Sequence, residues 1–141
     1  MENAFNPWNR AHLQAARFPL PLPADRELKQ VAIADIASFV AHAVAHVHEL
    51  ENQRIEIASD VLTGTRAAEI LTGATGRRFE FESLPIDGVN PGMARLFEWL
   101  DRFGEPADVA GLRAAYPAVG WHTFEEWATA QDWERLEPRI I

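Results

Sequence analysis

The stretch QVAIADIASFVAHAVAHVHELENQRIEIA, residues 30–58, decides the class of fold, because its hydrophobic periodicity changes twice. Its first four residues favour a short extended piece, and Asp35 is placed to cap a helix that begins at Ile36. Apolar side chains then recur at helical spacing and form one stripe: Ile36, Phe39, Val40, Ala43, Val44 and Val47. Arg54–Ala58 predicts a short strand with two isoleucines on one face. Strands separated by a helix imply a crossover connection and partly parallel pairing.

The neighbouring segments continue this alternation of strands and helices. Phe18–Pro23 alternates proline with large apolar residues, which favours an edge strand or a polyproline-like connector, since each proline removes a backbone donor. Thr63 or Thr65 can cap a second helix, which stops at Gly76. Phe79–Glu82 alternates with a period of two, as a half-exposed strand does.

The last third of the chain predicts helices only. Pro91 suits a first helical turn, and a strong apolar stripe follows it: Met93, Leu96, Phe97, Leu100 and Phe103. A shorter helix contains Val109 and Leu112, and Thr123 with Glu126 forms a capping box that opens a final helix. We therefore predict an α/β fold of few short, partly parallel strands with crossover helices, followed by a helical C-terminal lobe.

The length of 141 residues favours a single domain, which we place at residues 1–131, with a loosely attached tail at 132–141. Parallel sheets normally need cover on both faces, and this chain supplies few helices for that purpose. We therefore expect either a homo-oligomer or a further segment of protein that completes the sheet.

Composition and charge exclude several classes of protein. The net charge is −8 and Arg77-Arg78 is the closest approach to a basic patch, so we expect no nucleic-acid partner. The absence of cysteine excludes disulfides, thiolate metal sites and a cysteine nucleophile. No window approaches the ~18 apolar residues of a membrane span, and the first twenty residues lack the pattern of a signal peptide. These features favour a cytoplasmic protein with no membrane partner.

Familiar catalytic and metal-binding patterns are missing. The close glycine pair at Gly73–Gly76 falls at a helix end, where the helix dipole repels phosphate, and forms no dinucleotide loop. His42 and His46 lie one helical turn apart, and a third metal ligand would have to come from Glu49 or distant His122. The single tyrosine has no lysine four residues later, as the short-chain dehydrogenase pair requires. We predict no catalytic residue and no metal site in this chain.

The first eight residues, Met1-Glu2-Asn3-Ala4-Phe5-Asn6-Pro7-Trp8, place polar groups beside aromatic rings, as the wall of a ligand pocket does. They resemble a segment of the NmrA-like family, relatives of the short-chain dehydrogenases, in which a buried strand ends in Met-Glu-Asn and a Pro-Trp follows. The resemblance continues in order to about residue 130. Its further segments are residues 30–37, 54–58, 62–64, 67–68, 97–99, 116–117 and 120–121.

The resemblance implies that this chain is the C-terminal part of such a protein, without the N-terminal half that holds the dinucleotide-binding core. Glu2 and Asn3 would approach the nicotinamide end of NAD(P). Arg54–Ala58 would join the large parallel sheet of that core. Four apolar side chains would wall the pocket for a small-molecule substrate or effector: Phe5, Trp8, Met93 and Phe97.

Members of the family with both halves are quinone-type reductases or redox-sensing regulators that bind NAD(P). The resemblance therefore implies the substrate- or effector-binding portion of an NAD(P)-dependent oxidoreductase or redox-sensing regulator. Such a portion would bind no cofactor tightly and would not be catalytic alone. The alternative, suggested by the sheet with too little cover, is a stand-alone interaction module that forms homo-oligomers or complements a dehydrogenase-like partner.

Overall fold

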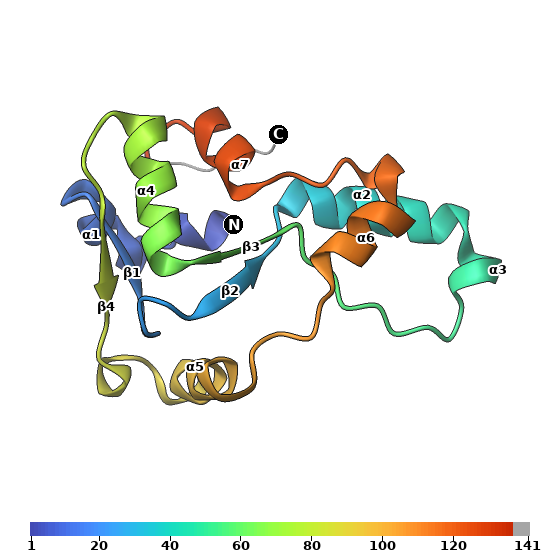
Figure 1. Cartoon of the computed structure of the whole chain (residues 1–141), viewed down its shortest axis with the longest axis horizontal. Helices are drawn as coiled ribbons and strands as arrows, with labels where there is room; N and C mark the ends of the chain where they lie inside the picture. The colour runs from blue at the N-terminus through green and yellow to red at the C-terminus, as the bar shows by residue number, and fades with distance from the viewer. Residues whose placement is uncertain (137–141) are drawn as a thin grey trace.

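The computed structural model describes residues 1–136, in which short strands alternate with helices (Figure 1). The strands are β1 Arg17–Leu20, β2 Glu27–Gln30, β3 Asp60–Thr63 and β4 Glu80–Ser83. The α-helices are α1 Arg10–Gln14, α2 Ile33–Ala45, α3 Val47–Leu50, α4 Gly64–Thr75, α5 Pro91–Phe103, α6 Val109–Ala115 and α7 Phe124–Ala130. Short 3-10 turns lie between them: η1 Glu2–Phe5, η2 Pro7–Asn9, η3 Ile86–Gly88 and η4 Pro117–Val119.

The strands in the described part of the chain form two separate pairs instead of one sheet. β1 and β4 run parallel, with Phe18 opposite Phe81, and α4 packs against both strands. β2 and β3 run antiparallel, with Leu28 opposite Leu62. The structure thus confirms an α/β fold with few short strands, one parallel pair and helical crossovers.

The ends of α4 form as the sequence predicts. The Thr63 hydroxyl caps the helix by accepting a hydrogen bond from the Arg66 N–H, and Gly76 ends it with φ 68°, in the left-handed region that glycine favours. The first residue of the helix has a second constraint. A Cβ atom on Gly64 would overlap the ring of Phe81, so the close approach of α4 to β4 favours glycine at this position.

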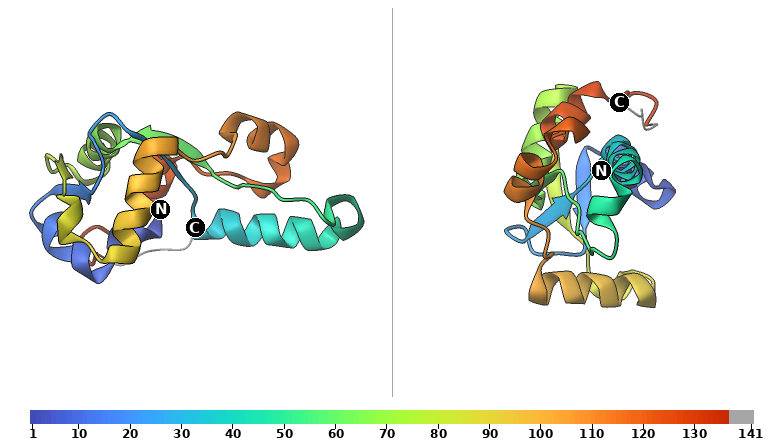
Figure 2. Two further views of the ribbon diagram at one scale, coloured as in Figure 1. Left: turned by 90° about the horizontal axis from the view of Figure 1, so that it is seen from below. Right: turned by 90° about the vertical axis from the view of Figure 1, so that its right-hand side faces the viewer.

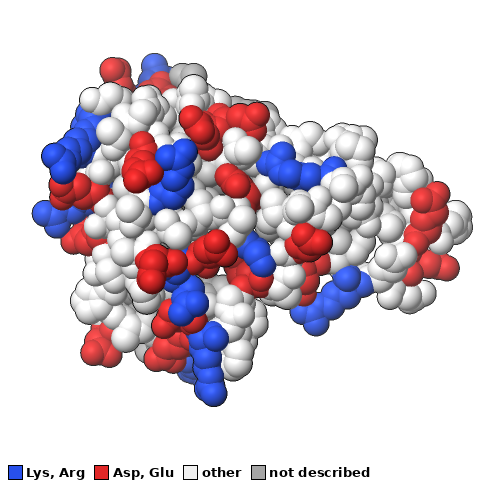
Figure 3. Space-filling view, viewed as in Figure 1, with Lys and Arg blue, Asp and Glu red and all other residues white. Residues whose placement is uncertain are grey.

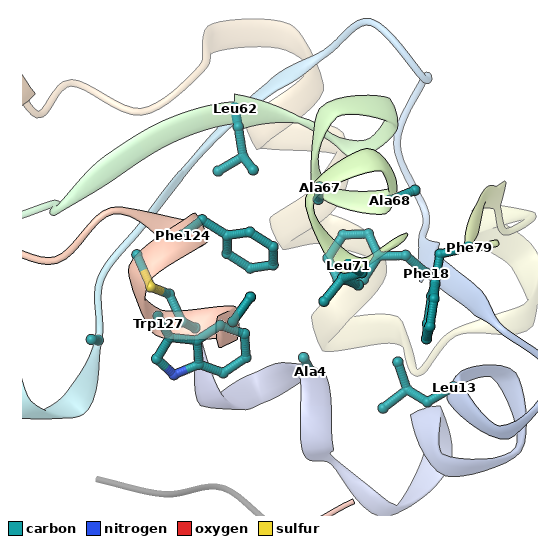
Figure 4. Packing of buried hydrophobic residues seen from close by; sticks show 13 residues of the cluster. Ala4, Leu13, Phe18, Leu62, Ala67, Ala68, Leu71, Phe79, Phe124 and Trp127 are labelled. Atoms are coloured by element: carbon teal, nitrogen blue, oxygen red, sulfur yellow. The ribbon is translucent and has the colours of Figure 1, made fainter. Parts of the chain in front are cut away.

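The first hydrophobic cluster fills the space between β1, α4, α7 and the N-terminal segment (Figure 4). Its largest members, Trp127 and Phe124, are fully buried on α7, and their ring centroids lie 5.2 Å apart. The capping box that opens α7 is present, because the side chains of Thr123 and Glu126 each accept a hydrogen bond from the backbone N–H of the other. α7 is therefore held both by its cap and by the core that it completes.

The second cluster is smaller and lies along an arm of the molecule, where α2, α6 and the segment between α3 and β3 run side by side (Figure 2). Phe39 on α2 packs against Trp121 and Tyr116, with ring centroids 5.8 and 5.2 Å away. The predicted short helix around Leu112 is confirmed as α6 and contributes to the same cluster.

The start of α2 differs from the prediction. The helix begins at Ile33, with Ala32 at the cap position, and Asp35 lies inside the first turn instead of capping the helix. A tertiary contact replaces the missing cap, since the Glu2 carboxylate accepts the Ile33 N–H at 3.1 Å. Asp35 is then available for other partners.

The predicted strand at Arg54–Ala58 is wrong for this structure. The strand of this region is β3, which begins at Asp60, and residues 54–58 make no backbone hydrogen bond within the described chain. Ile55 and Ile57 still turn toward the second cluster while Glu56 is exposed, so the alternating pattern is kept without a paired strand.

Two helices form where the sequence predicts them but leave most of their apolar stripes uncovered. On α2 only Phe39 of the stripe is buried, and Val44 is 72% exposed. On α5 only Leu100 is buried, and Phe103 is 63% exposed. Helical spacing placed these residues on a common face, but the described chain provides no neighbour to cover that face.

The predicted division into residues 1–131 and a tail stays a prediction. Trp133 packs its ring against Phe5 and Trp127, with centroid distances of 5.0 and 5.9 Å, so the start of residues 132–141 contacts the first cluster. Residues 137–141 lie outside the described residues.

Candidate functional site

Glu2 lies at a junction between the N-terminal segment, α2 and α7. Its side chain is 8% exposed. One carboxylate oxygen accepts the Ile33 N–H, and the other accepts the indole N–H of Trp127 at 3.0 Å. In this structure Glu2 therefore ties the start of α2 to α7, and its contact with a nicotinamide stays a prediction.

The other predicted residues of the N-terminal segment have unequal surroundings. Asn3 is exposed, and its carbonyl oxygen accepts hydrogen bonds from the Asn6 N–H and the Asn9 side-chain amide, at 3.2 Å each. Phe5 is half-buried against the first cluster, whereas Trp8 is 70% exposed. Asn3 and Trp8 are the two of these residues that a ligand or partner can reach directly.

Met93 and Phe97 lie one turn apart on α5, away from the N-terminal segment (Figures 1 and 2). Within the described chain no hydrogen bond or ring contact joins α5 to Glu2, Asn3 or Phe5. The structure thus places the six predicted residues in two groups, and a single pocket that contains both groups stays a prediction.

The most densely bonded polar group near this junction is Asp35, which is 1% exposed. One oxygen accepts hydrogen bonds from the Ser59 hydroxyl and, at 3.0 Å, from the His122 N–H. The other oxygen lies 2.5 Å from Nδ1 of the His122 ring. The Arg113 guanidinium adds a bidentate contact to the Ser59 carbonyl oxygen, at 2.9 and 3.2 Å. Three segments far apart in the sequence are joined by this one carboxylate.

The arrangement orients the imidazole of His122. Because Asp35 contacts Nδ1, that nitrogen carries the proton when the ring is neutral, and Nε2 is left with a lone pair. The His122 side chain is 29% exposed, and no described residue bonds its Nε2. An aspartate that fixes a histidine in this way suits proton exchange with a ligand. It equally suits a structural tie, since the histidine backbone binds the same carboxylate.

Sequence reasoning missed this cluster. Asp35 carried the signal of a helix cap, and His122 was considered only as a distant metal ligand. Ser59 followed a predicted strand without any motif around it. The available signal was a single carboxylate in the first turn of an otherwise apolar helix, because such a group requires partners from elsewhere in the fold if it is buried.

Two recesses on the surface of the described chain contain no predicted site residue. The larger, of about 660 Å³, is an open groove between α4 and β4. Its walls include Thr65, Thr72 and Phe81. The smaller, of about 280 Å³, lies between α1, the end of α4 and Trp133.

His42 on α2 and His46, which follows the helix, lie against each other. The rings of His42 and His46 stack with centroids 4.1 Å apart, and the described residues contain no group of three or more side chains placed to hold a metal ion. Within residues 1–136, no helix combines the length and the apolar character needed to cross a membrane.

Comparison with known protein families identifies the family of this chain. A family model described as the NmrA-like family matches residues 3–128, which is most of the chain. No curated protein matches this sequence. NmrA-like proteins include NAD(P)-binding oxidoreductases and regulators, so the match supports a function of that general kind.

Proposed function

This chain belongs to the NmrA-like family, and on that premise we propose that it is the substrate- or effector-binding portion of an NAD(P)-dependent oxidoreductase or redox-sensing regulator. The dinucleotide-binding core is supplied by protein outside these 141 residues, so the isolated chain is not catalytic. The observation that carries the proposal is that the backbone of residues 54–58 has no hydrogen-bond partner in the described chain.

Residues 54–58 have the features of a strand that lacks its sheet. Ile55 and Ile57 pack inward, Glu56 is exposed, and the backbone between them has no hydrogen-bond partner in the described chain. Backbone N–H and C=O groups are paired in most folded proteins, and a strand edge readily accepts a further strand. A sheet edge from a dinucleotide-binding core would satisfy these groups.

Other open surfaces support the same assignment. The parallel pair β1–β4 has no further strand on either side in the described residues, whereas parallel strands are otherwise found inside larger, covered sheets. Most of the stripe on α2 is exposed, and this helix runs beside residues 54–58 (Figure 2). A crossover helix normally packs on the sheet that its strands belong to, so one partner sheet would cover both features.

In the complete assembly, Glu2 and Asn3 face the nicotinamide, and Phe5, Trp8, Met93 and Phe97 wall the substrate or effector pocket. Trp8 and Met93 are exposed in this chain, so the supplied core can cover them and close the pocket. The cofactor's phosphates are bound by the supplied core, because the glycine pair of this chain ends α4 and forms no phosphate loop.

Calorimetric titration with NADPH and NADH tests the division of roles. We expect no binding by this chain alone at micromolar cofactor. We expect binding once the chain is purified in complex with a co-expressed dinucleotide-binding half of an NmrA-like protein. Tight binding by the chain alone, or failure of the two halves to associate, would contradict the proposal.

Substitution within residues 54–58 tests the observation itself. Glu56→Pro removes one N–H donor at an exposed position, so it should abolish association with the supplied half. Glu56→Ala is the matched control, since it loses the same exposed ion pair with Arg54 but keeps the N–H. Equal association by the two variants would show that residues 54–58 do not pair.

A second candidate function is a self-associating interaction module, which the surface of α2 favours. Residues 36–48 contain no Asp, Glu, Lys or Arg, although the chain carries a net charge of −8. A second copy can therefore approach this helix without like-charge repulsion. Sedimentation separates the candidates: a monomer at micromolar concentration contradicts self-association. A dimer that Val40→Glu and Val44→Glu dissociate, and that Glu56→Pro leaves intact, supports it.

A further inference from the structure

The smaller recess brings two arginines together with two aromatic rings. It has a volume of about 280 Å³ and opens between α1, the end of α4 and the segment after α7. Its walls combine guanidinium groups, aromatic rings and a few polar side chains: Arg10, Gln14, Thr75, Arg77, Phe79, Trp133, Glu134 and Leu136.

Neither arginine of the recess contacts a carboxylate within residues 1–136. No hydrogen bond or ion pair to Arg10 occurs within the described chain. Arg77 donates to the Gln14 carbonyl oxygen at 2.6 Å and lies 5.8 Å from the centroid of the Phe79 ring, and no carboxylate of the described residues contacts it. Elsewhere on the visible face, basic and acidic groups are intermingled (Figure 3). In a chain with a net charge of −8, two unpaired guanidinium groups at one recess mark a local preference for an anion.

The aromatic side of the recess is held in place by the core. The Trp133 indole N–H donates to the Ala128 carbonyl oxygen at 2.7 Å, and its ring packs on Phe5 and Trp127. The Phe79 ring is buried and lies 6.3 Å from that of Trp133 in an edge-on arrangement. A rigid aromatic wall beside guanidinium groups suits a flat apolar body that ends in an acid.

We infer that this recess binds a small aromatic anion, in which a single ring carries a carboxylate or a phosphate monoester. The acid pairs with Arg10 and with the donors of Arg77 that Gln14 leaves available, while the ring lies against Trp133 and Phe79. The volume of about 280 Å³ is slightly below the roughly 300 Å³ of the smallest usual ligand pockets. A dinucleotide therefore does not fit in the recess. Glu134 is the opposing charge on the rim and weakens the site.

The inference is independent of the proposed function. The recess lies beside α1 and the end of α4, whereas residues 54–58 and the exposed stripe belong to the arm formed with α2 (Figure 1). Loss of either proposal leaves the other in place.

Titration of the full chain with benzoate and with phenyl phosphate tests the site, with the indole N–H resonance of Trp133 as reporter. Trp133→Phe identifies that resonance. We expect both probes to shift it at low salt, and benzyl alcohol to be at least tenfold weaker because it lacks the charge. An equal response to benzyl alcohol, or no shift with either anion, would overturn the inference. A tighter fit for benzoate or for phenyl phosphate identifies the acid that the site prefers.

Two charge variants should change the affinity for phenyl phosphate in opposite directions. Arg10→Gln should weaken phenyl phosphate binding about tenfold, since it removes a charge-assisted contact and Arg10 makes no hydrogen bond or ion pair within residues 1–136. Glu134→Gln should tighten binding a fewfold, because it removes like charge from the rim. Arg95→Gln on α5 is the control and should leave the affinity unchanged. Equal weakening by Arg95→Gln and Arg10→Gln would show general electrostatic attraction and would contradict a defined site.

Discussion

The two hydrophobic clusters of this chain differ in how completely they are enclosed. The first contains the fully buried Trp127, Phe124 and Leu71, and it is covered by strands, by helices and by the N-terminal segment. The second packs one face of α2 and leaves Val40 and Val44 exposed. The difference shows where this chain is self-sufficient and where it depends on further protein.

The largest expected effect tests the enclosure of the first cluster. Trp127→Ala should lower the free energy of unfolding by about 3–5 kcal/mol, because it leaves a cavity and removes the donor to Glu2. Val44→Ser on the uncovered stripe should change it by less than about 0.5 kcal/mol. Urea unfolding of both variants measures the contrast, and similar losses would show that α2 is covered in solution.

The next effect tests the link between the clusters. Asp35→Ala removes the acceptor that joins α2 to Ser59 and His122, and should cost about 2–4 kcal/mol. Ser59→Ala removes one donor only and should cost about 1 kcal/mol. Denaturant unfolding supplies both values. A smaller loss for Asp35→Ala than for Ser59→Ala would contradict the central position of the carboxylate.

A third prediction compares two glycines of α4. Gly64→Ala should destabilise the chain by about 1–3 kcal/mol, because its new methyl group collides with the Phe81 ring. Gly73→Ala meets nothing within 4 Å and should stabilise the helix by up to about 1 kcal/mol. Thermal melting measures both changes, with a lower melting temperature expected for Gly64→Ala and a higher one for Gly73→Ala. Stabilisation by both changes would mean that α4 and β4 are less closely packed than described.

The smallest effect concerns pH and the cap of α7. Hydrogen bonds from the Thr123 backbone and hydroxyl lower the pKa of Glu126 below its usual value. A lowered pKa in the folded state contributes stability above the ordinary glutamate pKa of about 4.3, and this stability is lost as the pH falls through the lowered value.

Glu126→Gln should therefore cost roughly 0.5 kcal/mol at pH 7, a figure reduced for the exposure of the side chain, and nothing at pH 2. Glu125→Gln is the control in the same helical turn and lacks the contact with Thr123. Unfolding curves across this pH range measure the difference. A loss at pH 7 that persists at pH 2 would exclude the charge of Glu126 as its cause.

Local signals predicted the elements that depend on neighbours in the sequence. The Thr63 cap and the Gly76 stop of α4, Pro91 at the start of α5 and the Thr123 capping box all formed where expected. Each involves hydrogen bonds or backbone conformations within a few residues, so sequence spacing is sufficient to identify it.

Contacts between distant segments account for the failures. Asp35 satisfies every local rule for a cap, but Glu2 occupies the start of α2 from thirty-one residues away. Residues 54–58 have the composition of a strand, but a strand also needs a partner edge. The same limit applies to the predicted pocket, because no spacing rule can bring α5 to the N-terminal segment.

The sequence by itself determined the α/β class, the family, the two ends of α4, the starts of α5 and α7, and the absence of a glycine-rich phosphate loop in this chain. The tertiary structure decided which faces are buried, made Asp35 the link between three segments, and assembled a recess with two arginines from three separate elements. The physical reason is the distance along the sequence between the residues that interact. Caps and helical faces depend on residues within one or two turns, whereas burial, carboxylate pairing and strand pairing depend on residues brought together only by the fold.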